Sequence, residues 1–87
     1  MKKANYLLER IRNIFDKTKR GRALDLGCGQ GDYSKILKDL GFEVVASDLD
    51  EEVFKYKNEI EFKQCDITER LAFPDNSFDY VLLLEVI

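Results

Sequence analysis

The stretch RALDLGCGQGDYSKIL, residues 22–37, decides how this chain folds. It opens with a short apolar run, places glycine at every second position, and closes with apolar residues at helical spacing. Glycine adopts positive φ angles and lets another molecule approach the backbone closely. Gly27, Gly29 and Gly31 therefore predict a turn from a strand into a helix that faces a ligand, although a purely structural tight turn would use the same residues.

Helical and extended patterns alternate along the rest of the chain. A first helix is predicted by apolar residues at helical spacing, and Gly21 is expected to end it; those residues are Ala4, Leu7, Leu8, Ile11, Ile14 and Phe15. After it we expect a strand at 22–26, a helix at 33–40, a strand at 42–47, a short weak helix at 50–58 and a strand at 60–64. A turn at 74–77 then leads into the last strand, at 78–87. Such alternation indicates an α/β fold with a parallel sheet and right-handed crossovers.

Length and composition narrow the function classes. The 87 residues suit one small domain, 1–87, and a content of 45% hydrophobic and 36% charged residues is ordinary for a globular protein. The sequence shows neither a long apolar run nor signal-peptide features at its start, so a cytoplasmic location is expected. No histidine is present, and Cys28 and Cys65 lack zinc-ligand spacing, so we expect no Cys/His metal site and two buried thiols.

Charge is unevenly distributed along the chain. Residues 1–22 carry eight basic and two acidic side chains, whereas residues 23–87 carry six and fifteen. A basic segment can mark a nucleic-acid or membrane surface. Here the apolar stripe of the first helix makes its basic residues the solvent face of an amphipathic helix, and we expect no nucleic-acid binding.

Acidic residues follow two of the predicted strands. Asp48 ends the second strand, seventeen positions after Gly31, close to the spacing at which an acid binds ribose hydroxyls in nucleotide-binding folds. The nearby acids 50–52 are alternatives to it. Asp66 ends the third strand, where it could accept from an adenine amine, and Leu49 and Ile67 offer apolar faces for the ring.

The spacing of the loop bears on the kind of adenosine ligand. A dinucleotide fingerprint is G-x-G-x-x-G, with a pyrophosphate at the helix N-terminus, whereas this loop reads G-x-G-x-G and follows Asp25. A carboxylate there is a poor neighbour for a pyrophosphate and a good one for an ammonium group. Asp32, at the start of the second helix, is expected to cap it. A ligand that combines adenosine with an amino acid is therefore favoured over NAD.

Four motifs together resemble those of the class I S-adenosylmethionine-dependent methyltransferases. They are LDLGCGQGDYSKIL, VVASDLD, FKQCDI and FPDNSFDYVLLLEVI, and the resemblance covers residues 21–87. It implies a Rossmann-like parallel sheet with flanking helices and strand order 3-2-1-4, truncated after strand four. It also implies S-adenosyl-L-methionine as the cofactor.

The resemblance assigns the glycine loop to the methionine part of the cofactor. The backbone of Gly27, Cys28 and Gly29 would line that part, with Gly31 completing the loop. Asp25 would hold either the loop or the ammonium group of the cofactor.

The other strand ends would bind the adenosine part. By the resemblance, Asp48 would bind the ribose hydroxyls, Leu49 and Ile67 would flank adenine, and Asp66 would meet its amine. Glu85, at the end of strand four, would face the methyl group.

Three functions follow from these observations. The first is a methyltransferase of which this chain carries the N-terminal, cofactor-binding half; the acceptor-binding part that family members carry after strand four is not among the motifs found. The second is a non-catalytic S-adenosylmethionine-binding module that acts with a partner chain, and the third is a small NAD-binding protein. Since YVLLLEVI would form an edge strand with few charges, we also expect a homo-oligomer through strand four.

Overall fold

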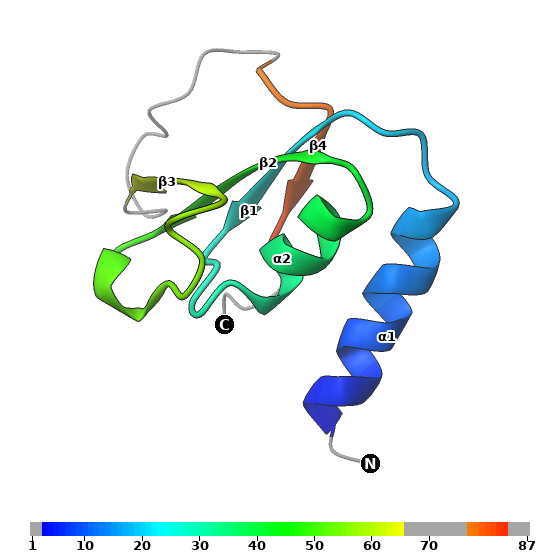
Figure 1. The fold of residues 1–87 in the computed structure, drawn as a ribbon, viewed down its shortest axis with the longest axis horizontal. Helices are drawn as coiled ribbons and strands as arrows, with labels where there is room; N and C mark the ends of the chain where they lie inside the picture. Colours follow the sequence, from blue (N-terminus) through cyan, green and yellow to red (C-terminus); the bar gives the residue numbers. More distant parts are fainter. Residues whose placement is uncertain (1–2, 66–76, 84–87) are drawn as a thin grey trace.

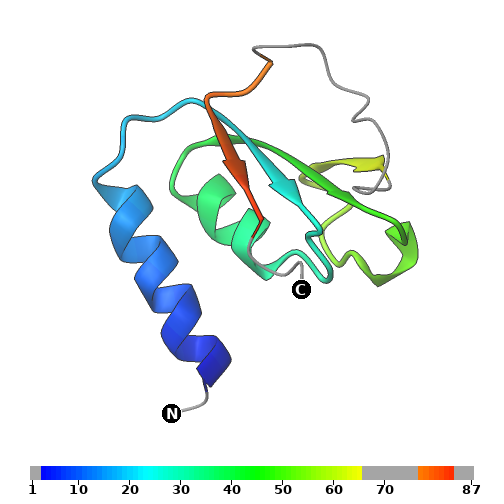
Figure 2. The ribbon, with the colours of Figure 1, turned by 180° about the vertical axis from the view of Figure 1, so that it is seen from behind.

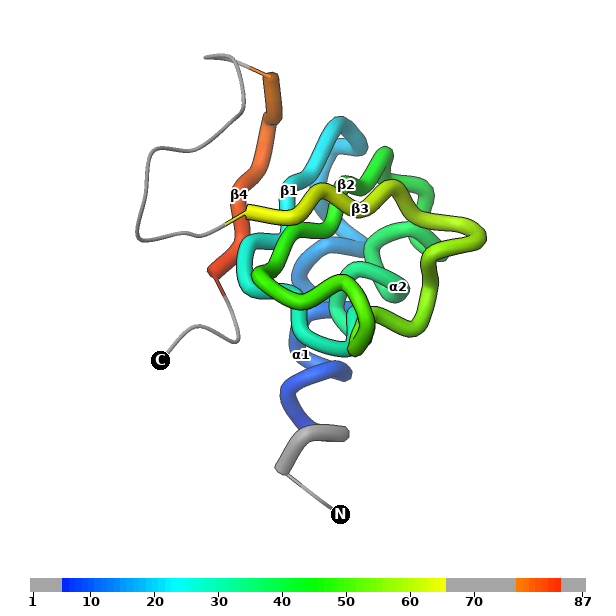
Figure 3. Tube along the Cα trace, turned by 90° about the vertical axis from the view of Figure 1, so that its left-hand side faces the viewer, coloured from blue at the N-terminus to red at the C-terminus, as the bar shows by residue number. Residues whose placement is uncertain are grey.

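In the part of the chain that the structure describes, four parallel strands form one sheet. The structure, a computed structural model, describes residues 3–65 and 77–83. The strands pair in the order β3-β2-β1-β4, as Figures 1 and 3 show, and this confirms the predicted Rossmann-like order; they are β1 (Arg22–Leu26), β2 (Glu43–Asp48), β3 (Glu61–Gln64) and β4 (Tyr80–Leu82). In the register of the sheet Asp25 lies between Ala46 and Leu82, so strand β1 is central.

Across residues 3–65 and 77–83, two α-helices accompany the sheet. Helix α2 (Asp32–Asp39) packs on β1 and β2, and helix α1 (Lys3–Asp16) packs against α2. Figure 2, the view from behind, shows the strands in front of α2 with α1 beside it. A short 3-10 helix, η1 (Glu51–Val53), lies in the connection from β2 to β3. Among the described residues no helix has the length and apolarity needed to cross a membrane.

The core has two parts because successive side chains of a strand point to opposite faces of the sheet. The larger part lies on one face and comprises Ala23, Cys28, Leu37, Phe42, Val44, Ala46, Phe54, Ile60 and Leu82. The smaller part comprises Leu24, Leu26 and Val45, with Phe78 packed against it. Both cysteines, Cys28 and Cys65, are buried free thiols, as the sequence predicts.

The first helix does not end at Gly21, and this prediction was wrong. Helix α1 ends at Asp16, where the Arg20 guanidinium donates from Nη1 to backbone carbonyl oxygens of the last turn and of Thr18, at 2.7–3.2 Å. Gly21 has another role: a Cβ there would collide with the carboxylate of Asp79, which accepts from the backbone N–H of Arg22 at 2.9 Å. Glycine at this position therefore makes room for a contact between β1 and the segment before β4.

The helix predicted at 50–58 was also wrong. Only η1 is helical there, with Asp50 as its N-cap accepting from the N–H of Glu52 at 2.9 Å. Phe54 follows in an extended conformation and is 2% exposed, and Ile60 is 3% exposed. The chain leaves the helical conformation at Phe54, whose side chain is buried in the core, so tertiary packing overrides the weak helical pattern.

Strand β1 has its predicted bounds, and the remaining boundaries differ from the predictions by one residue, except in strand four. Strand β2 runs one residue later than expected, and α2 begins and ends one residue earlier. Strand β4 comprises Tyr80–Leu82, and residues 84–87 of the predicted strand lie outside the described residues.

Candidate functional site

The loop 27–31 joins β1 to α2 at the carboxyl edge of the sheet (Figure 1). Gly27, Gly29 and Gly31 all have positive φ angles, of 69°, 56° and 98°. The N–H groups of Gly27 and Cys28 both donate to the carbonyl of Ser47, at 2.8 and 3.0 Å. Since Ser47 lies near the end of β2, the loop is folded against the neighbouring strand.

Asp48 ties the middle of this loop to β2. Its Oδ2 accepts from the N–H of Gly29 at 2.7 Å, and its Oδ1 accepts from the N–H of Leu49 at 2.6 Å. An ionised carboxylate has about four acceptor positions, so two such bonds leave capacity for hydroxyl donors. The structure therefore brings together Asp48 and the glycine loop, which are nineteen residues apart in sequence.

Asp25 lies behind the loop, at the end of β1. Its side chain is 0% exposed, and its Oδ2 accepts from the hydroxyl of Ser34 in the first turn of α2 at 2.7 Å. This bond joins the strand before the loop to the helix after it. Ser34 is also 0% exposed, and the sequence does not reveal its role because helical periodicity alone does not show which polar side chain will meet a buried acid.

Gly31 has a packing reason of its own. A Cβ at this position would collide with the ring of Phe54, and its φ of 98° also disfavours other residues. The N–H of Lys55, next to Phe54, donates to the carbonyl of Gln30 at 2.9 Å. The β2–β3 connection therefore supports the end of the loop, a contribution that the sequence analysis did not predict.

Asp32 does not cap α2, and this prediction was wrong. The N-cap is Gly31, which has no side chain to accept a bond. The Asp32 carboxylate instead pairs with the ammonium of Lys55 at 3.2 Å and accepts from the hydroxyl of Tyr56 at 3.4 Å. The bond to Asp32 raises the pKa of Lys55 above its ordinary value.

Apolar side chains follow Asp48 at the surface. Leu49 is 58% exposed and Val53 46%, and the carbonyl of Leu49 accepts from the amide of Gln64 at 2.7 Å. By contrast, Cys28 is 0% exposed, so its thiol is buried and offers no contact to a ligand at the loop. The other three predicted site residues, Asp66, Ile67 and Glu85, lie outside the described residues.

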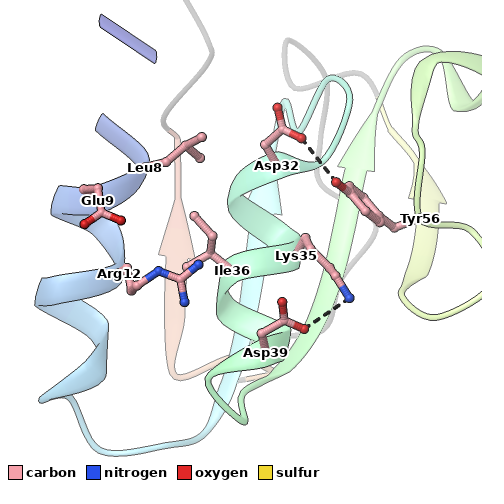
Figure 4. A pocket seen from close by; sticks show the side chains of 8 residues that line it. All are labelled: Leu8, Glu9, Arg12, Asp32, Lys35, Ile36, Asp39 and Tyr56. Atoms are coloured by element: carbon pink, nitrogen blue, oxygen red, sulfur yellow. Dashed lines mark hydrogen bonds and ion pairs between the residues drawn. The ribbon is translucent and has the colours of Figure 1, made fainter. Parts of the chain in front are cut away.

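A hollow of about 450 Å³ lies between α1 and α2 (Figure 4). It is lined by Leu8, Glu9, Arg12, Asp32, Lys35, Ile36, Asp39 and Tyr56. The ammonium of Lys35 pairs with Asp39 at 3.1 Å and with Glu59 at 2.7 Å, and both bonds raise its pKa. Because several of its charges neutralise one another and only its Asp32 end adjoins the loop, we place the functional site at the carboxyl edge.

The described residues also contain no group of three or more His, Cys, Asp or Glu side chains placed to hold a metal ion. What the carboxyl edge offers is a carboxylate, loop backbone and exposed apolar side chains. This combination suits an organic ligand with hydroxyl groups and an apolar ring.

Comparison with known proteins agrees with this geometry. A family model described as "Methyltransferase domain" matches residues 24–87. The Bacillus subtilis (strain 168) protein named "Putative methyltransferase YqeM" is 39% identical over 71 residues, which are 74% of this chain and 28% of that protein. A ubiquinone biosynthesis O-methyltransferase of Rickettsia typhi is 28% identical over 94% of this chain and 36% of its own length.

Two solved structures share the fold. PH0226 from Pyrococcus horikoshii OT3 superposes with a TM-score of 0.77 at 35% identity, over 93% of this chain and 42% of that one. The plantazolicin methyltransferase BpumL, solved with SAH, gives a TM-score of 0.52 at 23% identity, over 90% of this chain and 32% of that one. This chain thus spans less than half the length of each of these relatives.

The matched model covers most of the chain, and the sheet, its strand order and the glycine loop agree with it. The chain therefore belongs to the methyltransferase domain family, in the class I fold whose cofactor is S-adenosyl-L-methionine.

Proposed function

We propose that this chain binds S-adenosylmethionine at the carboxyl edge of β1 and β2 and supplies the cofactor-binding half, residues 1–87, of a methyltransferase. The observation that carries the proposal is the bond from the N–H of Gly29 to Asp48. This bond holds a carboxylate that can accept further hydrogen bonds beside a glycine loop whose backbone a ligand can approach. Leu49 exposes an apolar side chain next to this carboxylate.

The roles of the single residues follow from this placement. Asp48 would bind the ribose hydroxyls, because a carboxylate accepts well from paired hydroxyl donors. Leu49 would cover one face of adenine, and the backbone of 27–29 would line the methionine part. Asp66, Ile67 and Glu85 keep the roles that the family resemblance implies.

Methyl transfer requires little acid or base catalysis from these residues. The bound cofactor supplies an electrophilic methyl group, and the protein contributes by holding it in line with a nucleophile and by fixing its orientation. In this chain the loop backbone and Asp48 would fix the orientation of the cofactor. Hydrogen bonds hold the loop against Ser47 and Asp48 of strand β2.

Two alternatives remain distinct from this proposal. A non-catalytic module would bind the cofactor equally well and act only with a partner chain. An NAD-binding protein is disfavoured because the loop lacks the dinucleotide spacing and a buried carboxylate, Asp25, lies behind it.

Isothermal titration with S-adenosylmethionine, S-adenosylhomocysteine (SAH) and NAD tests the proposal. We expect binding of the first two and none of NAD. Binding of NAD alone would contradict the proposal. Transfer of a labelled methyl group to candidate acceptors then separates the enzyme from the non-catalytic module.

We also propose self-association through β4. Within the described residues β4 is one edge strand of the sheet and β3 is the other, and Val81 and Leu83 are 55% and 57% exposed. Sedimentation should show a dimer that Val81→Pro weakens, since proline removes a donor from the strand; a monomer at micromolar concentration would contradict this. The cytoplasmic location and the expectation of no nucleic-acid binding stay predictions.

A further inference from the structure

We propose that Ser34 is a positioning residue for the cofactor, acting through Asp25; the inference rests on the proposed function. Ser34 makes a 2.7 Å hydrogen bond from its hydroxyl to Oδ2 of Asp25, and both side chains are 0% exposed. Neither group can reach a ligand through solvent, so any effect of this bond on binding must pass through the loop between them.

The position of the bond explains why it would matter. Asp25 lies two residues before Gly27, and Ser34 lies three residues after Gly31, so the bond closes both ends of the loop 27–31 on each other. Burial makes such a bond sensitive, because a buried carboxylate that loses a donor keeps the cost of its desolvation. A loop held this way keeps its N–H and Cα groups in one arrangement, which is what a precise binding site requires of its supporting contacts.

Different contacts support the two sides of the loop, so loss of the Asp25–Ser34 bond should affect the two ends of the ligand unequally. Asp48 and the apolar Leu49 lie on the side proposed for adenosine, and Asp48 is bonded to Gly29 independently of Ser34. The Asp25–Ser34 bond lies behind the part proposed for the amino-acid end of the ligand. Losing it should therefore weaken contacts to the amino-acid end more than contacts to adenosine.

The test compares two ligands by calorimetry. SAH carries the amino-acid end, and 5′-methylthioadenosine retains the adenosine and sulfur but lacks that end. We expect Ser34→Ala to raise the Kd for SAH about fivefold or more and that for methylthioadenosine less than about twofold, since one buried hydrogen bond of this kind is lost. Ser34→Thr, which keeps the hydroxyl, should recover most of the affinity for SAH.

A double-mutant cycle asks whether Ser34 acts through Asp25. If it does, Asp25→Ala, which removes the acceptor of the bond, and the double variant Asp25→Ala, Ser34→Ala should bind SAH with similar Kd values, because residues that act as a unit are not additive. Asp39→Ala is the matched control: it removes a carboxylate at the exposed far end of α2 and should leave both Kd values unchanged.

Equal losses for the two ligands, or additive effects in the cycle, would overturn the inference and leave Ser34 as a general support of the fold. Unchanged binding of SAH by a folded Ser34→Ala variant would also overturn it. If that variant fails to fold, Ser34→Cys, of nearly equal size and with a weaker donor, takes its place and should show a smaller loss with the same ligand preference. A wild-type protein that binds neither ligand would overturn the proposed function, and this inference with it.

Discussion

The carboxyl edge and the amino edge of the sheet, where its strands end and begin, are held by charged side chains of opposite sign. At the carboxyl edge, Asp48 accepts from the backbone N–H groups of Gly29 and Leu49. At the amino edge, Arg20 donates to the carbonyls at the end of α1 and, from Nε, to the carbonyl of Leu40 at the end of α2 at 2.6 Å. One edge thus uses acceptors, and the other uses donors.

Different backbone groups explain this difference. At the amino edge, the last turns of α1 and α2 leave carbonyls without partners in the helix, and these accept from Arg20. At the carboxyl edge, the N–H groups of Gly29 and Leu49 belong to the segments that follow β1 and β2, and these donate to Asp48. Aromatic rings reinforce the amino edge: Phe15, Phe42 and Tyr80 meet edge to face at 5.6–6.0 Å. The comparison suggests that the carboxyl edge serves binding and the amino edge serves stability, and the following variants test that separation.

The largest effect is expected at Gly29. Gly29→Val should abolish SAH binding, because a β-branched side chain would enter the space beside the loop and cannot easily adopt a φ of 56°. Gly29→Asn sharpens the test, since asparagine tolerates positive φ but still adds a side chain. Calorimetry should show lost binding in both, with circular dichroism reporting a folded Asn variant; normal binding by a folded Val variant would make the loop a structural turn only.

Asp48→Ala should lower the affinity for SAH at least about tenfold, since charge-assisted bonds contribute about 1.5–3 kcal/mol each. Its neighbour Asp50 is the control, because Asp50 caps η1 and makes no described contact with the loop. Asp50→Ala should bind SAH within about twofold of wild type. If Asp50→Ala loses affinity and Asp48→Ala does not, the ribose role belongs to Asp50.

At the amino edge, Arg20→Met should lower the free energy of unfolding by about 2 kcal/mol, a value reduced from the sum of its bonds because the side chain is 40% exposed. Arg20→Lys should recover only part of this loss, since lysine lacks the planar fork. Chemical denaturation measures both. The Kd for SAH should stay the same, and a large change in Kd would break the separation between the two edges.

The smallest effect concerns Lys35, whose pKa is raised above 10.5 by its bonds to Glu59 and Asp39. A raised pKa in the folded state contributes stability below the unfolded value, and this stability is lost as pH rises through the folded value. The free energy of unfolding should therefore fall above about pH 10.5 more steeply in wild type than in Lys35→Met. Identical slopes in denaturant titrations at pH 9–12 would show that these exposed pairs contribute nothing measurable.

Local pattern was enough to predict most of the elements. The strand 22–26 was predicted with the boundaries that the structure shows, because a short segment with three apolar residues is bounded by glycines on both sides. The helix expected at 50–58 failed for the opposite reason, since its pattern was weak and Phe54 gains more from burial than a short helix gains from its own bonds. Gly21 was misread because its contact, Asp79, lies far away in sequence.

The candidate site also has features that short sequence patterns predict and features that only tertiary contacts decide. The sequence by itself determined the glycine loop, the acid after the second strand and the family, because these depend on residue types at short spacings. Only the tertiary structure decided that Asp48 bonds to Gly29, that Ser34 meets Asp25, and that the ring of Phe54 occupies the space beside Gly31. Each of these contacts joins residues from different elements, and it forms only when the sheet brings those elements together, so no local pattern could encode it.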